Sequence, residues 1–320
     1  MFGIWDLKPK IKMTSTSVEC PVKGCSQSVE RQHDHFRREE RYYCPDHKIY
    51  ISPSTFEYAN EEDNLLWKSK PDLDLLKAIK TVKRESRIAR DNSEDALTWN
   101  IFRFLEITNQ LGGLLSWLTQ MEHAQTELIY WSYSQKTKEA WSELNKARKE
   151  FGENLQRSSE PDLIAITNRA LFFIEAKLTA PNDTLPSDPN NRKKYLTGGK
   201  EWYGQVFASD FYTIAIRTKK YELLRFWLLG SWIAEQIKRD FYLINVVPIE
   251  RETDIEKQFT PHIRVTGNRQ FKRLSWEELY GYVAANVPDG EDRRRLTVYF
   301  ENKTIGYDPF RMLQKAFSIK

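Results

Sequence analysis

The sequence lacks an apolar run long enough to span a membrane. Its longest apolar stretch, Tyr221–Ala234, is interrupted by Glu222 and Arg225 and is shorter than the roughly 20 residues that a spanning helix requires. The first residues, 1–12, alternate lysine with apolar residues and lack the apolar core and small-residue cleavage site of a secretory signal. We therefore expect a cytoplasmic protein with no membrane partner, in which Tyr221–Ala234 forms a buried helix.

The chain also has little net charge. A formal charge of +4 over 320 residues is too small by itself to indicate a protein that binds polyanions. The basic residues are nevertheless unevenly distributed, with groups at residues 77–90, 192–200 and 293–295. Solvent-exposed helix faces account for many such groups, so their positions have to support any nucleic-acid hypothesis.

Cysteine is scarce, with three residues that all lie in the first 44 positions. An odd number in a chain of cytoplasmic character argues against a disulfide framework. Cys20 and Cys25 form one pair, Cys44 and His47 a second, and each pair has turn-forming residues beside it. The spacing predicts a structural zinc ion with a closed Cys3His ligand set. His33 and His35 are alternative ligands to His47.

The chain shows no internal repeat or low-complexity tract, and its composition changes mainly at residues 52–71, where Pro, Ser, Asn and acidic residues cluster. We predict a zinc-binding module over 1–60, a linker with a basic helix over 61–92, and a main domain with a C-terminal extension over 93–320. A polar loop is predicted over 179–199. Hydrophobic periodicity and turn residues predict an α/β fold with helices over 72–90, 92–110, 114–121, 136–155, 201–216, 221–237, 276–287 and 309–317, and strands over 126–134, 162–167, 170–177, 241–249 and 296–300.

Three charged residues stand at the ends of two strands that are otherwise apolar on both faces. If Asn168 and Arg169 close a hairpin, residue numbers paired across it sum to 337, and Asp162 faces Glu175. Two opposed carboxylates are destabilising unless something neutralises them, and a divalent cation would do so. Lys177 projects from the same face as Glu175 because side chains alternate along a strand. In this register Lys177 stands opposite Glu160.

A fourth carboxylate lies in the predicted helix over 92–110. Glu94 precedes Leu97 by three residues and Ile101 by seven, so it points with the apolar stripe of that helix. Asp95 is the alternative, and either acid could simply stabilise the helix dipole in the first turn.

Together these residues resemble the PD-(D/E)xK nuclease superfamily, which includes the restriction-endonuclease-like proteins. Glu160-Pro161-Asp162 and Glu175-Ala176-Lys177 are similar to its Pro-Asp and Glu-x-Lys elements, and the helix that carries Glu94 is similar to its acid-bearing first helix. The resemblance covers residues 93–250. It implies a mixed central sheet flanked by helices, and residues 93–320 as a nuclease domain.

The resemblance also implies the roles of the site residues. Asp162, Glu175 and Glu94 would bind Mg²⁺ or Mn²⁺, and Lys177 would orient the attacking water. The main-chain carbonyl of Ala176 is a further candidate ligand, because Mg²⁺ accepts oxygen ligands in octahedral geometry. Gln205 resembles a glutamine that some members place near the active-site lysine, although Ser209 stands where the exonuclease-type members have tyrosine.

The implied activity is hydrolysis of DNA, with RNA not excluded, and a role in restriction or phage defence. A homodimer or a defence-system protein is the protein partner to be considered. The basic residues expected to contact phosphates are Arg192, Lys193, Lys194 and Lys200. Two other hypotheses stay open: a non-catalytic zinc-containing protein that binds nucleic acid, and a scaffold for protein interactions built around the zinc module.

Overall fold

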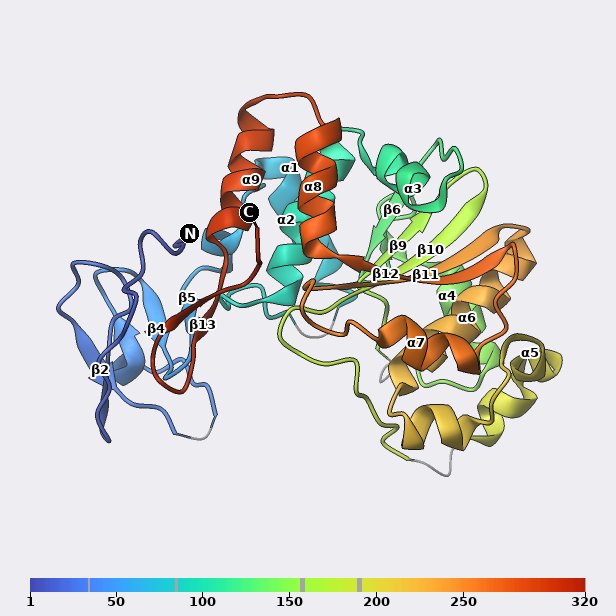
Figure 1. Cartoon of the computed structure of the whole chain (residues 1–320), viewed down its shortest axis with the longest axis horizontal. Coiled ribbons are helices and arrows are strands. Elements are labelled where there is room, and N and C mark those ends of the chain that lie inside the picture. Colours follow the sequence, from blue (N-terminus) through green and yellow to red (C-terminus); the bar gives the residue numbers. More distant parts are fainter. Residues whose placement is uncertain (34, 84–85, 156–158, 189–191, 320) are drawn as a thin grey trace. The chain divides into compact units, whose positions relative to one another are not determined.

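The computed structural model describes residues 1–320 except 34, 84–85, 156–158, 189–191 and 320 (Figure 1). The described chain divides into two compact units. Unit 1 comprises Met1–Asp72, Glu85–Ile107 and Trp276–Lys320, and unit 2 comprises Leu73–Arg84 and Thr108–Ser275. These compact units differ from the predicted modules at 1–60, 61–92 and 93–320. The predicted modules are functional divisions, and their boundaries stay a prediction.

Unit 2 is built on a seven-stranded mixed sheet with the strand order β12-β11-β10-β9-β6-β7-β8. Strands β9 and β10 form an antiparallel hairpin, whereas β10, β11 and β12 run parallel to one another. Together with the helices of this unit, the sheet confirms the predicted mixed α/β fold. The strands are β6 Glu127–Tyr130, β7 Tyr133–Ser134, β8 Glu139–Ala140, β9 Leu163–Ile166, β10 Ala170–Ala176, β11 Asp240–Val247 and β12 Arg269–Ser275.

The main hydrophobic core of unit 2 lies between this sheet and three helices. α6 packs against β10 and β11, and α4 and α5 pack against α6 (Figure 1). Phe173 of β10 meets Phe226 of α6 edge to face, while its neighbour Phe172 stacks on Tyr242. Adjacent residues of β10 thus alternate between the two faces of the sheet. The helices of unit 2 are α3 Leu111–Thr119, α4 Ser142–Glu150, α5 Lys193–Val206, α6 Tyr221–Ile237 and α7 Ile255–Phe259, with a π-helix η3 Thr213–Arg217 and a 3-10 helix η4 Thr260–His262.

Unit 1 contains the N-terminal strands together with helices from later in the sequence. Its first strands are β1 Ser17–Glu19 and β2 Ser28–Glu30, which form a hairpin, and β3 Tyr43–Cys44, β4 Ile49–Ile51 and β5 Phe56–Tyr58, which form a small sheet. Its other elements are α2 Glu94–Ile107, α8 Trp276–Asn286, α9 Glu291–Asn302, β13 Thr304–Tyr307, β14 Leu313–Lys315 and the 3-10 helices η1 Glu40–Tyr42 and η2 Glu61–Asn64. α1 Lys70–Ile79 crosses the boundary between the units.

Several predicted elements are wrong. The helix over 72–90 ends at Ile79, the one over 136–155 is confined to α4, and the one over 201–216 is broken after Val206. The predicted polar loop over 179–199 gives way to α5 at Lys193. Residues 84–85 and 189–191 of these segments lie outside the described residues.

The C-terminal predictions fail for a clear physical reason. Leu296–Phe300, predicted as a strand, lies inside α9, where Leu296, Tyr299 and Phe300 are buried at helical spacing and Val298 is exposed. The predicted helix over 309–317 is instead the second half of the β13–β14 hairpin. That hairpin needs Gly306, whose backbone has φ +103 and passes against the carbonyl of Ser54, where a side chain would not fit.

Candidate active site and metal centre

The β9–β10 hairpin has the predicted register. Ile174 pairs with Leu163, so the next position outward places Glu175 opposite Asp162. The Asp162 carboxylate is held firmly, because Oδ2 accepts the backbone N–H of Ala176 at 2.8 Å and Oδ1 accepts Nε1 of Trp131 at 3.1 Å. A carboxylate oxygen can accept more than one bond. Asp162 can therefore still coordinate a cation.

Glu175 lies near the end of β10 and is almost completely buried, with 4% of its surface exposed. Its Oε1 accepts a hydrogen bond from Nζ of Lys177 at 2.6 Å. Its Oε2 is buried and has no hydrogen-bond partner among the residues that the structure describes. Burial raises the pKa of Glu175 well above its usual value, Asp162 and Glu222 raise it further, and Lys177 opposes them.

Lys177 bridges two carboxylates from different elements. Besides Glu175, its Nζ contacts Oε2 of Glu222 in the first turn of α6 at 3.0 Å. Burial alone would lower the pKa of Lys177, but Glu175 and Glu222 outweigh it and hold that pKa well above the usual value. For Glu222, burial acts to raise the pKa, but Lys177 outweighs it and lowers the pKa. The lysine is therefore a fixed cation.

Glu222 was not among the predicted site residues. A signal for it is nevertheless present, because Glu222 precedes Phe226 by one helical turn and Glu175 follows Phe173 by two strand positions. Since Phe173 and Phe226 are in contact, Glu175 and Glu222 lie on the facing surfaces of strand and helix. Finding the pair required knowing that α6 packs on β10.

Glu160, expected opposite Lys177, lies beyond the start of β9 and contacts Arg148 at 3.5 Å. Arg225 of α6 is ion-paired with Glu153 through two contacts of 2.7 and 2.6 Å. The same guanidinium donates to Oγ of Ser159 at 2.6 Å. Arg225 thereby ties the segment before Asp162 to the helix that carries Glu222.

An amide pair supports the opposite side of the site. Asn245 of β11 is fully buried beside Glu175 in the parallel register, and its Nδ2 donates to the main-chain carbonyl of Glu175 at 3.3 Å. Asn182 and Asn245 also exchange side-chain hydrogen bonds of 2.7 and 3.1 Å. This pair fixes the segment that follows Lys177 against β11. A cavity of about 260 Å³ lies there, lined by Lys177, Thr179, Pro181, Val247 and Arg251 among others.

The remaining predicted site residues lie on several elements. Ala176 ends β10 and is buried, whereas Gln205 is an exposed side chain of α5. Glu94 begins α2 in unit 1 and is partly buried. The predicted phosphate-binding residues Arg192, Lys193 and Lys200 are exposed, and Lys194 lies over the ring of Tyr195 at 4.9 Å. The roles assigned to all these residues stay predictions.

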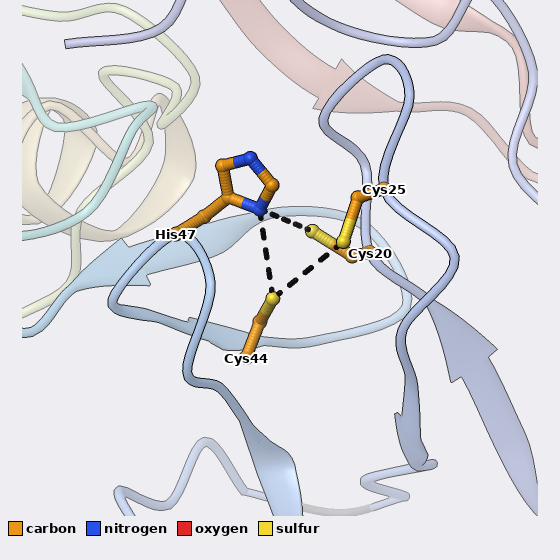
Figure 2. Close-up of side chains that lie close together, drawn as sticks. All are labelled: Cys20, Cys25, Cys44 and His47. Atoms are coloured by element: carbon orange, nitrogen blue, oxygen red, sulfur yellow. Dashed lines mark hydrogen bonds between the residues drawn. The ribbon is translucent and has the colours of Figure 1, made fainter.

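In unit 1, Cys20, Cys25, Cys44 and His47 form one compact cluster, as predicted (Figure 2). Cys20 and Cys25 lie in the connection of the β1–β2 hairpin, where Gly24 adopts φ +77, while Cys44 ends β3 and His47 lies in the β3–β4 connection. Their candidate ligand atoms all lie within 4.8 Å of one another. His33 and His35 are not part of this cluster.

The distances within the cluster suit a tetrahedral ion. Nδ1 of His47 lies 3.7 Å from Sγ of both Cys20 and Cys44, and Sγ of Cys25 lies 3.8 Å from Sγ of Cys44. Zinc–sulfur bonds of about 2.3 Å in a tetrahedron give edges of about 3.8 Å. All three cysteines are buried and not in disulfides. The cluster could therefore hold a structural zinc ion with no position left for substrate.

Comparison of the chain with protein-family models, with curated proteins and with solved structures found no significant match. Among the described residues, no helix is both long enough and apolar enough to cross a bilayer.

Proposed function

We propose that the protein is a divalent-metal-dependent nuclease of the PD-(D/E)xK type that hydrolyses phosphodiester bonds in DNA. The proposal places the reaction at Asp162, Glu175 and Lys177. Because the sequence resembles restriction-endonuclease-like proteins, DNA is preferred over RNA, and restriction or phage defence is the proposed biological role.

One observation supports the proposal most strongly. The buried Oε2 of Glu175 has no hydrogen-bond partner among the described residues, although leaving a buried polar atom unsatisfied costs about 1–3 kcal/mol. Asp162 adds a second negative charge across the hairpin. Oxygen ligands of this kind are those that Mg²⁺ and Mn²⁺ prefer, so a divalent ion would satisfy the orphaned oxygen and reduce the repulsion between the carboxylates.

Asp162 and Glu175 would hold the metal, with the carbonyl of Ala176 as a further proposed ligand. When bound, the ion would supply Lewis-acid activation of the phosphate and of water. Lys177 contributes hydrogen-bond donation and positive charge from Nζ, which Glu222 keeps protonated and directed alongside Glu175. Asn245 holds the β10 backbone at Glu175 in place.

A specific observation favours the main alternative, a non-catalytic nucleic-acid-binding protein. Lys177 bridges Glu175 and Glu222 through ion pairs of 2.6 and 3.0 Å, as a structural ion-pair network would. Buried networks of this kind perturb pKa values without catalysing a reaction. That interpretation leaves the orphaned Oε2 of Glu175 unexplained.

The decisive experiment measures metal binding and cleavage on the same variants. With Mg²⁺ or Mn²⁺, the wild type should cleave plasmid, linear or single-stranded DNA, and Asp162→Ala, Glu175→Ala and Lys177→Ala should each abolish cleavage while remaining folded. Lys177→Ala should still bind the metal in calorimetry, because its carboxylate ligands remain. Glu235→Gln, an exposed position on α6, is the matched control and should retain activity.

Full activity in Asp162→Ala would refute the assigned site. A wild-type protein that binds nucleic acid and cleaves none with either metal would favour the binding-protein alternative.

We also propose that the Cys3His cluster holds one structural zinc ion per chain. The proposal rests on the tetrahedral spacing of the four ligand atoms and on the complete burial of Cys20 and Cys44. Its role would be to stabilise unit 1, since a closed set of four protein ligands leaves no position for chemistry.

A further inference from the structure

A second cavity of unit 2, of about 650 Å³, opens at the start of α6 and is rich in positive charge. The side chains that carry the argument are Arg217, Lys219, Lys220, Lys257 and His262, with Asp183 the one carboxylate among those that line it. The basic side chains come from the end of η3 and the residues that lead into α6, and from α7 and η4. Two stretches distant in sequence thus contribute cations to one cavity.

Lys220 is the fixed element of this cavity. It is buried, with 3% of its surface exposed, and its backbone N–H donates to the carbonyl of Ile214 at 2.9 Å. Its Nζ carries three N–H donors, of which Asp183 accepts one at 2.6 Å. Asp183 is the one hydrogen-bond partner of Nζ among the described residues, and its own side chain is 49% exposed. A buried ammonium group with donors to spare is suited to a second anion.

The other basic side chains of the cavity can reach a ligand. Arg217 and Lys219 precede the buried lysine in the sequence and are exposed, and the Lys257 side chain is 84% exposed. Lys257 contacts Asp254 at 3.2 Å, an exposed pair of small energetic value that an anion can displace. Nδ1 of His262 is hydrogen-bonded to Oγ of Ser209 at 2.9 Å, which orients the ring and leaves Nε2 for a ligand. The positive charge of the cavity exceeds the single carboxylate of Asp183.

The position of the cavity relates it to the candidate active site. Lys220 precedes Glu222 by two residues, a separation of at most about 7 Å along the backbone. The segment Asp183–Thr184 contacts residues of both the cavity and the candidate active site. Asp183 pairs with Lys220, and Oγ1 of Thr184 accepts the backbone N–H of Glu222 at 2.8 Å. A strand bound at Lys177 would therefore carry neighbouring phosphates close to this cavity.

We propose that this cavity binds a phosphate group of the nucleic-acid substrate, beside the phosphate at the reaction centre. This inference rests on the proposed nuclease function for the identity of the ligand. Several lysine and arginine donors around one space match the multiple acceptor oxygens of a phosphate. The phosphate is either an internal phosphodiester or the terminal phosphate of a strand, and the two have the same recognition chemistry.

The test uses the full-length protein with Arg217, Lys219 and Lys257 all changed to Gln. Lys220 is kept, because removing it would leave Asp183 without its partner. The matched control, Lys136→Gln, Lys138→Gln and Lys149→Gln, removes the same charge from three exposed positions of unit 2. Binding of a labelled DNA duplex is followed by fluorescence anisotropy over a range of NaCl concentrations, without added divalent metal.

The cavity variant should bind the duplex on the order of tenfold more weakly. Its slope of log affinity against log salt should be shallower by about 0.9 for each phosphate that the protein no longer neutralises. Oligonucleotides with a 5′-phosphate or a 5′-hydroxyl identify the source: tighter binding of the phosphorylated one, absent in the cavity variant, indicates a terminal phosphate. Equal binding of the two oligonucleotides by the wild type, weakened equally in the variant, indicates an internal phosphodiester.

A cavity variant with the same affinity and salt slope as the control variant would overturn the inference. Cleavage is measured separately, so the two proposals can fail independently. If the cavity variant binds DNA more weakly and with a shallower salt slope, but the wild type cleaves no nucleic acid, the phosphate-binding cavity is supported and the nuclease proposal is refuted. If the wild type cleaves DNA in a metal-dependent reaction, but the salt slope of the cavity variant is unchanged, the nuclease proposal is supported and the phosphate-binding cavity is refuted.

Discussion

Metal binding at Asp162 and Glu175 should appear as a rise in thermal stability even where cleavage is not measured. An ion that binds only the folded state stabilises it by about 2.7 kcal/mol when its free concentration is 100 times its Kd. For a unit of about 150–250 residues, each kcal/mol shifts Tm by about 2–4 °C. The wild type should therefore melt about 5–11 °C higher at that concentration of Mg²⁺ or Mn²⁺.

Glu175→Gln should remove most of this rise. Gln has nearly the same shape as Glu, so the packing around residue 175 is retained and Lys177 still has Glu222 as a partner. The amide carries no negative charge, and the orphaned acceptor at Oε2 becomes either a donor or a neutral oxygen. Glu235→Gln is the control with the same chemical change at an exposed position of α6.

Lys177→Ala, in contrast to Glu175→Gln, should keep the metal-induced rise in Tm. Without metal, the buried carboxylates of Glu175 and Glu222 lose their shared cation, and breaking a buried ion pair typically costs about 3–5 kcal/mol. A divalent ion restores the charge balance. The metal-induced rise in Tm should therefore be at least as large as in the wild type, although cleavage is abolished.

Differential scanning fluorimetry or calorimetry over a metal titration measures the wild type and the three variants. An equal rise in wild type and Glu175→Gln would mean that the metal binds elsewhere. If metal raises the Tm of neither the wild type nor Glu235→Gln, the argument that the opposed carboxylates bind a divalent ion at this site is refuted.

The other predictions concern the zinc cluster, the basic residues at the start of α5 and the buried Glu153–Arg225 pair. Metal analysis of purified protein should give one zinc per chain, Cys44→Ser should lose it, and freely titratable thiols in the native wild type would contradict the site. Replacing Arg192, Lys193 and Lys194 by Ala should make the slope of log DNA affinity against log salt shallower by about 0.9 per phosphate contact. An unchanged slope would show that these residues do not contact DNA phosphates. For Glu153, burial acts to raise the pKa, but the Arg225 guanidinium outweighs it and lowers the pKa. Its stabilising contribution is therefore complete above the unfolded value of about 4.3 and disappears as pH falls through the lower folded value. Glu153→Gln should cost about 3–5 kcal/mol at neutral pH, and the difference from wild type in urea unfolding should shrink on acidification. A constant difference across that range would disprove the linkage.

The parts of the site that sequence could predict are those fixed by local geometry. A two-residue connection sets the register of β9 and β10, so the opposition of Asp162 and Glu175 follows from residue numbers alone. The zinc ligands are similar, because Cys44 and His47 are close in sequence and their hairpin brings them together. Choosing His47 over His33 and His35 required the structure.

The elements that sequence mispredicted are those in which tertiary contacts decide between two patterns. Leu296–Phe300 is rich in residues that favour strands, but the acids Glu291 and Asp292 stabilise the start of a helix, and burial at helical spacing decides the outcome. The hairpin that follows depends on a close approach between Gly306 and Ser54, two residues that are far apart in the sequence.

Glu222 shows what a strand pattern cannot reveal about the surroundings of Lys177. From the hairpin alone, Lys177 has Glu175 on its own face and an expected partner in Glu160, and nothing fixes its protonation state. The contact with Glu222 requires α6 to return across β10 with the correct face inward, a consequence of the parallel arrangement of β10 and β11. With two carboxylates at 2.6 and 3.0 Å, Nζ remains protonated despite its burial. Lys177 would therefore act on water and phosphate as a hydrogen-bond donor and a positive charge, while the proton of the attacking water passes to another acceptor.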